Sequence, residues 1–208
     1  PAGEGFGMRF SLRMLSECGM MKKTEKGCFG YLKRQRVVEW VKTVLYFALP
    51  IALFVMGLIS TGTRKNLLTI VAVLGCLPAS KSLVEAIMYQ RAKSCSDACY
   101  EAATKAAGDT KLLFDLYLTS YQKNFQISAL AIKNNALCGY TEDARCDLSA
   151  GEKHITEQLQ QSGYGGLVVK LFSEEDKFQE RLLQLGALPE KNAEKETAIA
   201  QVICSISL

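Results

Sequence analysis

Two apolar segments joined by six residues constrain this chain more than any other feature. The first, Thr43–Ser60 (TVLYFALPIALFVMGLIS), has 18 residues without a charge, and the second, Leu67–Ala79 (LLTIVAVLGCLPA), has 13. Crossing the hydrocarbon core of a bilayer takes about 20 helical residues. The first segment reaches that length if the Lys42 side chain extends toward the headgroups. We therefore predict a transmembrane helical hairpin. A buried hairpin in a soluble protein is the alternative, but the first segment is long and uniformly apolar for that role.

The apolar character of the second segment continues past Lys81 on one helical face. This face carries the side chains that we expect to pack close to the membrane: Leu83, Val84, Ile87 and Met88. The spacing predicts an amphipathic stalk that leaves the bilayer near Pro78. A two-helix hairpin has little else to cover such a stripe, so we expect it to mediate homo-oligomer formation.

Basic residues flank the hairpin unequally. Seven lysines and arginines lie between Lys22 and Lys42 and three between Lys81 and Lys93, whereas the connection 61–66 holds only Arg64 and Lys65. Positively charged flanks stay on the cytoplasmic side. The pattern predicts a multi-pass protein of the cell membrane with both termini cytoplasmic and residues 61–66 outside.

Charge divides the chain into unequal parts. Residues 1–93 carry 14 Lys/Arg and 5 Asp/Glu, whereas residues 94–208 carry 11 and 16. The expected organisation is a basic, disordered segment (1–36), the hairpin and stalk (37–93) and a cytoplasmic domain (94–208). The lipid bilayer is the expected partner of the basic part, and the acidic domain argues against a nucleic-acid partner. Residues 1–19 lack any helix or strand period, and we interpret them as a poorly ordered leader or an over-extended reading frame. Met20 or Met21 would be a more natural start.

The domain has strand and helix signals in a regular order. Strands are predicted at 111–121, 125–133, 136–140 and 166–172, with helices at 149–161, 173–186 and 193–206. In the first strand Leu112, Phe114, Leu116 and Leu118 should share one face. Ser149 and Glu152 have the spacing of a capping box. The fold class predicted is α+β, an antiparallel β-meander with helices packed on one face, and residues 108–208 are expected to fold alone.

Three sequences in the chain resemble small two-helix membrane proteins of Gram-positive bacteria. They are VLGCLPASKSLVEAIMYQRAK, FDLYLTSYQKNFQ and ALCGYTED. The resemblance covers most of the chain after about residue 36. It implies a hairpin with an attached domain, and no activity comes with it.

Cysteine and histidine offer limited chemistry. The pairs Cys95/Cys99 and Cys138/Cys146 provide four thiols for a zinc ion, but structural zinc sites usually have closer pairs such as Cys-x2-Cys. Packing explains Cys95 and Cys99 equally well, because they share a helix face. The only histidine, His154, lies in the first turn of a predicted helix, where an exposed surface position is favoured over a catalytic base. No cofactor or metal is predicted.

Carboxylates supply the candidate site. The loop after the third strand carries charged side chains at Glu142, Asp143, Arg145 and Asp147, and Asp115 lies in the first strand. Loops on a rigid scaffold commonly present binding residues, so we predict a membrane-anchored binding or regulatory module for an unknown cytoplasmic protein. The alternative is a membrane-tethered, metal-dependent hydrolase or nuclease that uses these carboxylates. It would require them to converge within about 5 Å.

Overall fold

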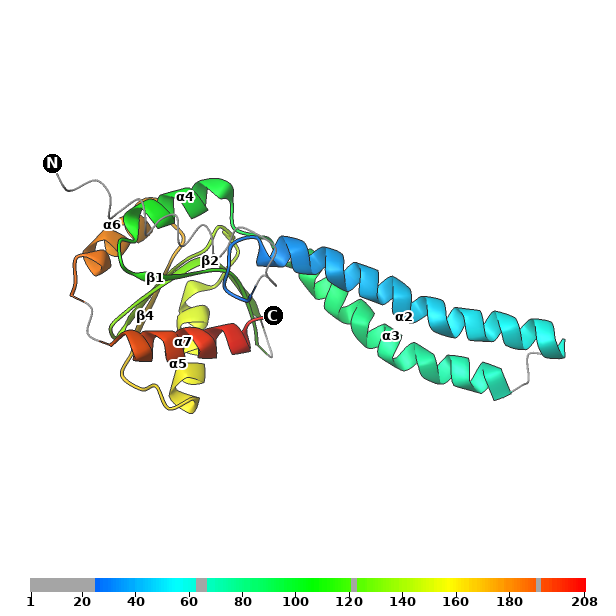
Figure 1. The fold of residues 1–208 in the computed structure, drawn as a ribbon. Coiled ribbons are helices and arrows are strands. Elements are labelled where there is room, and N and C mark those ends of the chain that lie inside the picture. The colour runs from blue at the N-terminus through cyan, green and yellow to red at the C-terminus, as the bar shows by residue number, and fades with distance from the viewer. Residues whose placement is uncertain (1–24, 63–66, 121–122, 190–191) are drawn as a thin grey trace. The chain divides into compact units, whose positions relative to one another are not determined.

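A computed structural model describes residues 25–62, 67–120, 123–189 and 192–208 (Figure 1). The chain forms two compact units: a helical unit of Leu32–Lys93, and an α+β unit made of the residues up to Tyr31 together with Ser94–Leu208. The predictions for residues 1–19 and for positions 63–66 of the connection lie outside the described residues.

The helical unit consists of two long helices, α2 (Tyr31–Thr61) and α3 (Leu67–Arg91). At 1.5 Å per residue they extend for about 46 Å and about 37 Å, longer than a hydrocarbon core of about 30 Å. Only 17% and 22% of their most apolar stretches are buried. The core helix of a soluble protein would be mostly buried. By length and composition, both helices are therefore able to cross a membrane.

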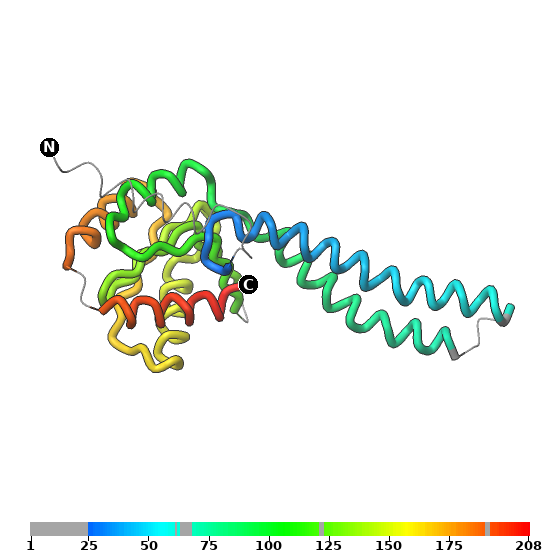
Figure 2. The backbone as a smooth tube through the Cα atoms, viewed as in Figure 1, coloured from blue at the N-terminus to red at the C-terminus, as the bar shows by residue number. Residues whose placement is uncertain are grey.

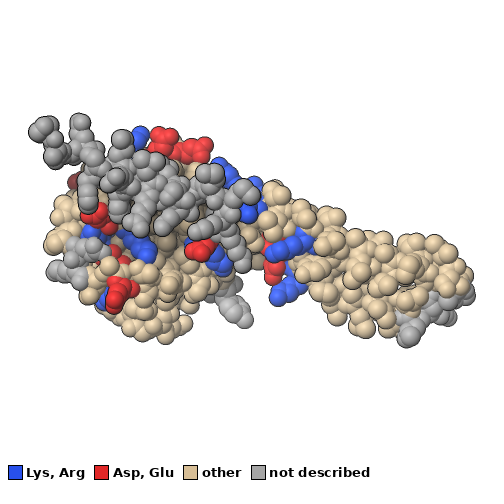
Figure 3. Space-filling model, viewed as in Figure 1, with Lys and Arg blue, Asp and Glu red and all other residues tan. Residues whose placement is uncertain are grey.

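Within α2 and α3, charged residues lie only toward the start of α2 and the end of α3. Residues 43–61 of α2 and 67–80 of α3 contain no charged side chain. On the face drawn in Figure 3, the charged residues of the two helices gather at one end, and the rest of the described surface of these helices is uncharged. An uncharged surface of this length is what the lipid interior requires.

Small residues at heptad spacing hold α2 and α3 together, and the two helices run side by side in Figures 1 and 2. The described buried residues are Tyr31, Leu32, Glu39, Thr43, Pro50 and Gly57 on α2, and Ala72, Ala79, Ser82, Ala86 and Tyr89 on α3. The Thr43 and Ser82 hydroxyl oxygens are 2.9 Å apart. A Cβ added at Gly75 would lie 3.3 Å from Pro50 Cβ. Small side chains thus let the two backbones approach closely, as in membrane helix pairs.

The predicted stalk stripe is not part of this seam. Val84 and Ile87 are exposed, and Leu83 and Met88 are half-buried. The sequence signal that marks the true seam is the spacing of Ala72, Ala79 and Ala86, seven residues apart. Within one chain the stripe therefore stays available, and self-association through it remains a prediction.

Arg36 of α2 has a structural role at the end of α3. Its guanidinium donates hydrogen bonds to the carbonyl oxygens of Tyr89 and Ala92, at 3.3 and 2.7 Å. The last carbonyls of a helix lack partners within the helix and carry partial negative charge, so a cation there is stabilising. Arg36, one of the basic residues used to predict the orientation, thus also caps the C-terminal end of α3.

The α+β unit is built on a four-stranded sheet in the order β1-β2-β3-β4. The elements are α4 (Asp97–Ala106), β1 (Lys111–Thr119), β2 (Asn124–Lys133), β3 (Ala136–Tyr140), α5 (Leu148–Gln161), β4 (Val168–Phe172), α6 (Glu175–Gly186) and α7 (Ala193–Ile206). The α+β class is confirmed. The sheet is mixed, however, because β4 pairs with β3 in parallel. The crossover through α5 between these two strands allows this direction.

Helices cover both faces of the sheet, so the prediction of helices on one face is wrong. Ile155 and Leu159 of α5 pack with Ile199 and Ile203 of α7 in one core cluster. Phe178 and Leu182 of α6 pack with α4 in a second cluster on the opposite face. Figure 1 shows α4 and α6 on one side of the strands and α5 and α7 on the other. Every residue of β2 after Asn124 is buried, as expected of a strand enclosed on both faces.

Asp115 interrupts the alternation of β1 side chains between the two faces of the sheet. Its backbone has φ +56°, a left-handed conformation that aspartate tolerates better than most residues. As a result Phe114 packs in the cluster with α4 and α6, whereas Leu116 and Leu118 pack in the cluster with α5 and α7. The prediction that Leu112, Phe114, Leu116 and Leu118 share a face is therefore wrong. A period of two assumes extended backbone throughout, and Asp115 interrupts it.

Residues 25–31 belong to the α+β unit, whereas the sequence predicts a separate segment 1–36. Gly27 accepts a hydrogen bond from Phe114 N–H at 2.8 Å, and the Phe29 ring stacks on Tyr100 at 4.3 Å. A Cβ on Gly27, where φ is +88°, would lie 2.8 Å from the Leu113 side chain. The helical unit is therefore inserted into the α+β unit between Tyr31 and Ser94.

β1 is an edge strand of the sheet. Residues 207–208 cover its outer edge, which Gly27 also contacts. Leu208 N–H donates to Tyr117 O at 3.0 Å, and Tyr117 N–H donates to Ser207 Oγ at 3.0 Å. Lys26 Nζ in turn donates to Ser207 O at 2.7 Å. Exposed strand edges promote aggregation unless they are covered. Two remote segments protect β1 here.

We predict that the α+β unit folds without the hairpin when residues 32–93 are replaced by a Gly/Ser linker of about ten residues, which spans roughly 18 Å. Far-UV circular dichroism should record one cooperative thermal transition. The 108–208 fragment lacks Phe29 and the α4 contacts, so it should melt without a cooperative transition, contrary to the expectation from sequence. A cooperative transition for 108–208 with an unchanged midpoint would show that these contacts contribute nothing.

Candidate functional site

Two thiols and a carboxylate meet at the start of α4. Cys95 directly precedes the N-cap residue Ser96, Cys99 lies in the first turn of α4, and Glu142 follows β3. One ligand atom from each of these three residues lies within 4.8 Å of the other two. Cys95 and Cys99 are buried, at 1% and 3% exposure, and Glu142 is exposed. Among the described residues this is the one group of three or more cysteine, histidine or acidic side chains with such convergence.

Asp115 holds the segment that leads into the cluster. Its carboxylate accepts hydrogen bonds from the Ser94 hydroxyl, at 2.9 and 2.8 Å to its two oxygens, and from Cys95 N–H at 2.7 Å. Asp115 is 2% exposed. A buried carboxylate is tolerated when donors of this kind satisfy it. The predicted site residue thus has an anchoring role, and its left-handed backbone aims it at Ser94 and Cys95.

Glu142 is fixed through both backbone and side chain. Its N–H donates to Ser128 Oγ of β2 at 3.3 Å, and its Oε2 accepts from Ser96 N–H at 3.1 Å. The second carboxylate oxygen, Oε1, makes no hydrogen bond to any residue in the described part of the chain. Glu142 therefore ties the end of β3 to the start of α4 while one oxygen remains available.

The environment favours protonated thiols at neutral pH. Hydrogen bonding with Cys99, followed by burial, raises the pKa of Cys95. Burial raises the pKa of Cys138 to about 12, although Arg181 acts in the opposite direction. Burial also raises the pKa of Tyr140, the last residue of β3. Reactive cysteines have a lowered pKa, so these side chains are not set up as free nucleophiles.

Asp143 and Arg145 bond to each other within the loop. Asp143 Oδ1 accepts a hydrogen bond from Arg145 N–H at 3.2 Å and pairs with Arg145 Nε at 3.4 Å. Asp143 N–H donates to Thr141 Oγ1 at 3.2 Å. The Arg145 side chain is 83% exposed. These contacts order the turn and leave Arg145 displayed at the surface.

Asp147 begins α5, which corrects the predicted capping box. The Asp147 carboxylate accepts from Ala150 N–H at 3.1 Å and pairs with Lys123 Nζ at 2.7 Å. Glu152 instead accepts from Leu171 N–H at 2.9 Å. Aspartate caps a helix as well as serine does, so the earlier residue takes the position from Ser149. The hydrogen bond from Lys123, followed by that from Ala150, lowers the pKa of Asp147.

The structure thus divides the predicted residues into separate sites. Asp115 and Glu142 lie around segment 94–96, whereas Asp143 and Asp147 are engaged elsewhere. The four do not converge into a shared carboxylate site. The four cysteines considered for zinc also separate, because Cys138 packs in the cluster with Cys95 and Cys99, and Cys146 packs against the other core cluster. Sequence reasoning noted Cys95/Cys99 and Glu142 independently but had no local signal that they meet.

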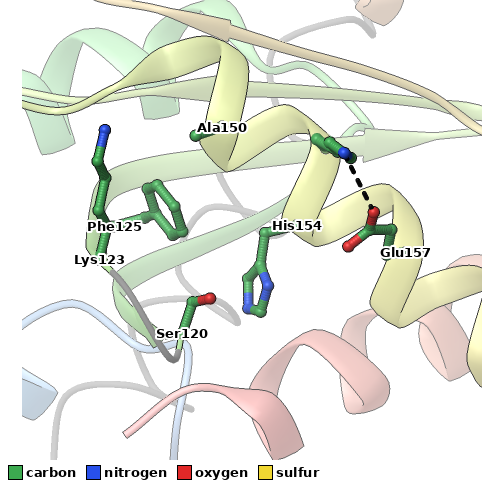
Figure 4. Close-up of a pocket in the computed structure, with 7 residues that line it drawn as sticks. Ser120, Lys123, Phe125, Ala150, His154 and Glu157 are labelled. Carbon is green, nitrogen blue, oxygen red and sulfur yellow. Dashed lines mark ion pairs between the residues drawn. The ribbon is translucent and has the colours of Figure 1, made fainter.

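His154 lines a surface pocket of about 300 Å³ between the β1–β2 hairpin and α5. Ser120, Phe125 and His154 lie around it in Figure 4, and the His154 ring is 5.6 Å from the Phe125 ring. Within the described residues no hydrogen bond joins Ser120 to His154. Both lysines of the pocket are paired with carboxylates, Lys123 with Asp147 and Lys153 with Glu157. Among its described lining residues, the pocket therefore has neither a Ser–His pair nor a lysine free of a carboxylate partner for an anionic ligand.

Comparison with known proteins adds no assignment: no family model, curated protein or solved structure matches this chain. The chemistry of the site accordingly rests on its own residues. Two thiols and one carboxylate are ligands for a metal ion of intermediate softness. They are not the all-carboxylate set that the alternative hydrolase would use.

We predict that Asp115→Ala lowers the free energy of unfolding by roughly 2–4 kcal/mol. It leaves the donors of Ser94 and Cys95 without their acceptor, and alanine tolerates the left-handed backbone poorly. Asp115→Asn should cost less, because asparagine keeps an acceptor oxygen and tolerates this conformation. Denaturant unfolding of the hairpin-free protein measures both. Equal losses for the two variants would contradict a role based on hydrogen bonding and backbone conformation.

Proposed function

We propose that this chain is a two-pass membrane protein whose α+β unit is a binding or regulatory module on the cytoplasmic side. The hairpin anchors the module and the loop after β3 meets a protein partner. The observation that carries the proposal is the long, uncharged and largely exposed surface of α2 and α3. A surface of that kind requires a lipid or protein environment.

The orientation rests on the flanking charges. Lys33, Arg34 and Arg36 lie in the first turns of α2, and Arg91 and Lys93 lie at and after the end of α3. Both groups are at the end of the hairpin that connects to the α+β unit in the chain. Basic flanks are retained on the cytoplasmic side, so the unit and both of its junctions are assigned to the cytoplasm.

A binding role is favoured over hydrolysis by the use that the fold makes of its carboxylates. Asp115 anchors segment 94–95, Asp147 caps α5, and Asp143 orders its own loop. A two-metal hydrolase needs carboxylates around a shared position. Arg145, in contrast, projects from an ordered turn, and exposed arginine is enriched where proteins bind one another.

Membrane orientation is tested with an introduced cysteine. Lys105 on α4 has a side chain 78% exposed, so Lys105→Cys should react with an impermeant maleimide only after the cells are lysed. Thr63→Cys, in the connection between the helices, should react in intact cells. The parent protein gives the background from its own cysteines. Labelling of Lys105→Cys in intact cells, with Thr63→Cys protected, would place the unit on the outer side.

Partner binding is tested by charge reversal at the loop. Arg145→Glu should reduce cross-linking to a cytoplasmic protein in living cells by about tenfold or more, the cost of losing one interfacial arginine. Arg181→Glu reverses an exposed arginine on α6, which contacts Gln184, and serves as the matched control. Quantitative mass spectrometry of the cross-linked products provides the measurement. Equal yields for the two variants would eliminate the loop as the binding surface.

A further inference from the structure

We propose that Cys95, Cys99 and Glu142 form a binding site for a zinc-class divalent cation. All three residues belong to the α+β unit, so the inference does not depend on the membrane orientation or on the protein partner. It concerns a smaller ligand set than the four cysteines considered from sequence.

The geometry of the three side chains fits tetrahedral coordination. Zinc binds sulfur at about 2.3 Å and carboxylate oxygen at about 2.1 Å, which sets ligand atoms roughly 3.5–3.8 Å apart. The observed ligand atoms lie within 4.8 Å of one another. Side-chain adjustments of about 1 Å would therefore complete the site. Three protein ligands leave a fourth position for water or another ligand.

Outer hydrogen bonds already hold the ligands in place. Asp115 accepts from Cys95 N–H, and Ser96 caps α4 by accepting from Cys99 N–H at 3.1 Å. Ser96 N–H also holds Glu142 Oε2, which leaves Oε1 for the metal. Supporting contacts of this kind orient metal ligands in proteins.

The ligand types select the metal and define the proton balance. Thiolates favour zinc and similar ions over magnesium or calcium, which prefer oxygen ligands. On binding, the S–H bonds of Cys95 and Cys99 break, two metal–sulfur bonds form, and two protons pass to the buffer. The Glu142 carboxylate binds without releasing a proton. Metal affinity should consequently rise with pH.

Cobalt provides the spectroscopic test, because Co²⁺ binds in zinc sites and, unlike Zn²⁺, absorbs visible light there. The full chain, purified in mild detergent under reducing and metal-free conditions, is titrated with Co²⁺ and then with Zn²⁺. We expect a tetrahedral spectrum with a thiolate-to-cobalt charge-transfer band, displaced by Zn²⁺. Cys95→Ser and Cys99→Ser should each weaken Co²⁺ binding by at least about tenfold, as should Glu142→Gln, which retains the band at saturation.

The matched control is Cys146→Ser, which removes a half-buried thiol outside the cluster and should leave the titration unchanged. Circular dichroism checks that each variant is folded. The proposal fails if the wild type shows no charge-transfer band, if the band survives loss of both Cys95 and Cys99, or if Cys146→Ser abolishes it. Proton release by the wild type needs no variant: two protons per Zn²⁺ at neutral pH are expected, and fewer than two would exclude a two-thiolate site.

Discussion

The buried Asp115 carboxylate is the interaction on which the α+β unit depends most. Its left-handed backbone shifts the faces of β1, so that Phe114 packs against one helical layer and Leu116 against the other. Its oxygens fix Ser94 and Cys95, the first residues of the unit after the hairpin. A single residue in an uncommon conformation thus sets how the sheet is covered and where the chain re-enters it.

The hairpin follows different packing rules from the sheet. In the α+β unit large side chains fill two clusters between helices and strands. Between α2 and α3 the residues buried at seven-residue spacing, such as Ala72, Ala79 and Ala86, are small, and most of the large apolar residues are exposed. Close backbone approach and hydroxyl contacts of this kind also hold helix pairs together in lipid, where there is no hydrophobic drive to bury leucine between helices.

Local signals in the sequence were sufficient for most elements. The apolar periodicity and the turn residues predicted the strands that end at Lys133 and Tyr140, and the three helices after residue 148. Asn134 has a left-handed backbone, which agrees with a turn between those two strands. The remaining features depend on contacts far apart in the chain. Pairing of Gly27 with Phe114, the approach of Glu142 to Cys95 and the covering of both sheet faces have no local period. The Asp147 cap was missed because two good capping residues lie two positions apart.

The interrupted α+β unit also dictates an order of events during synthesis. Residues 25–31 are synthesised before the hairpin but have no partner until β1 has followed it. The outer edge of β1 is completed only by Ser207 and Leu208, which follow α7. A nascent chain that has not yet reached these residues would thus present an open strand edge, the kind of surface that chaperones and proteases recognise. The α+β unit therefore covers this edge only late in its synthesis.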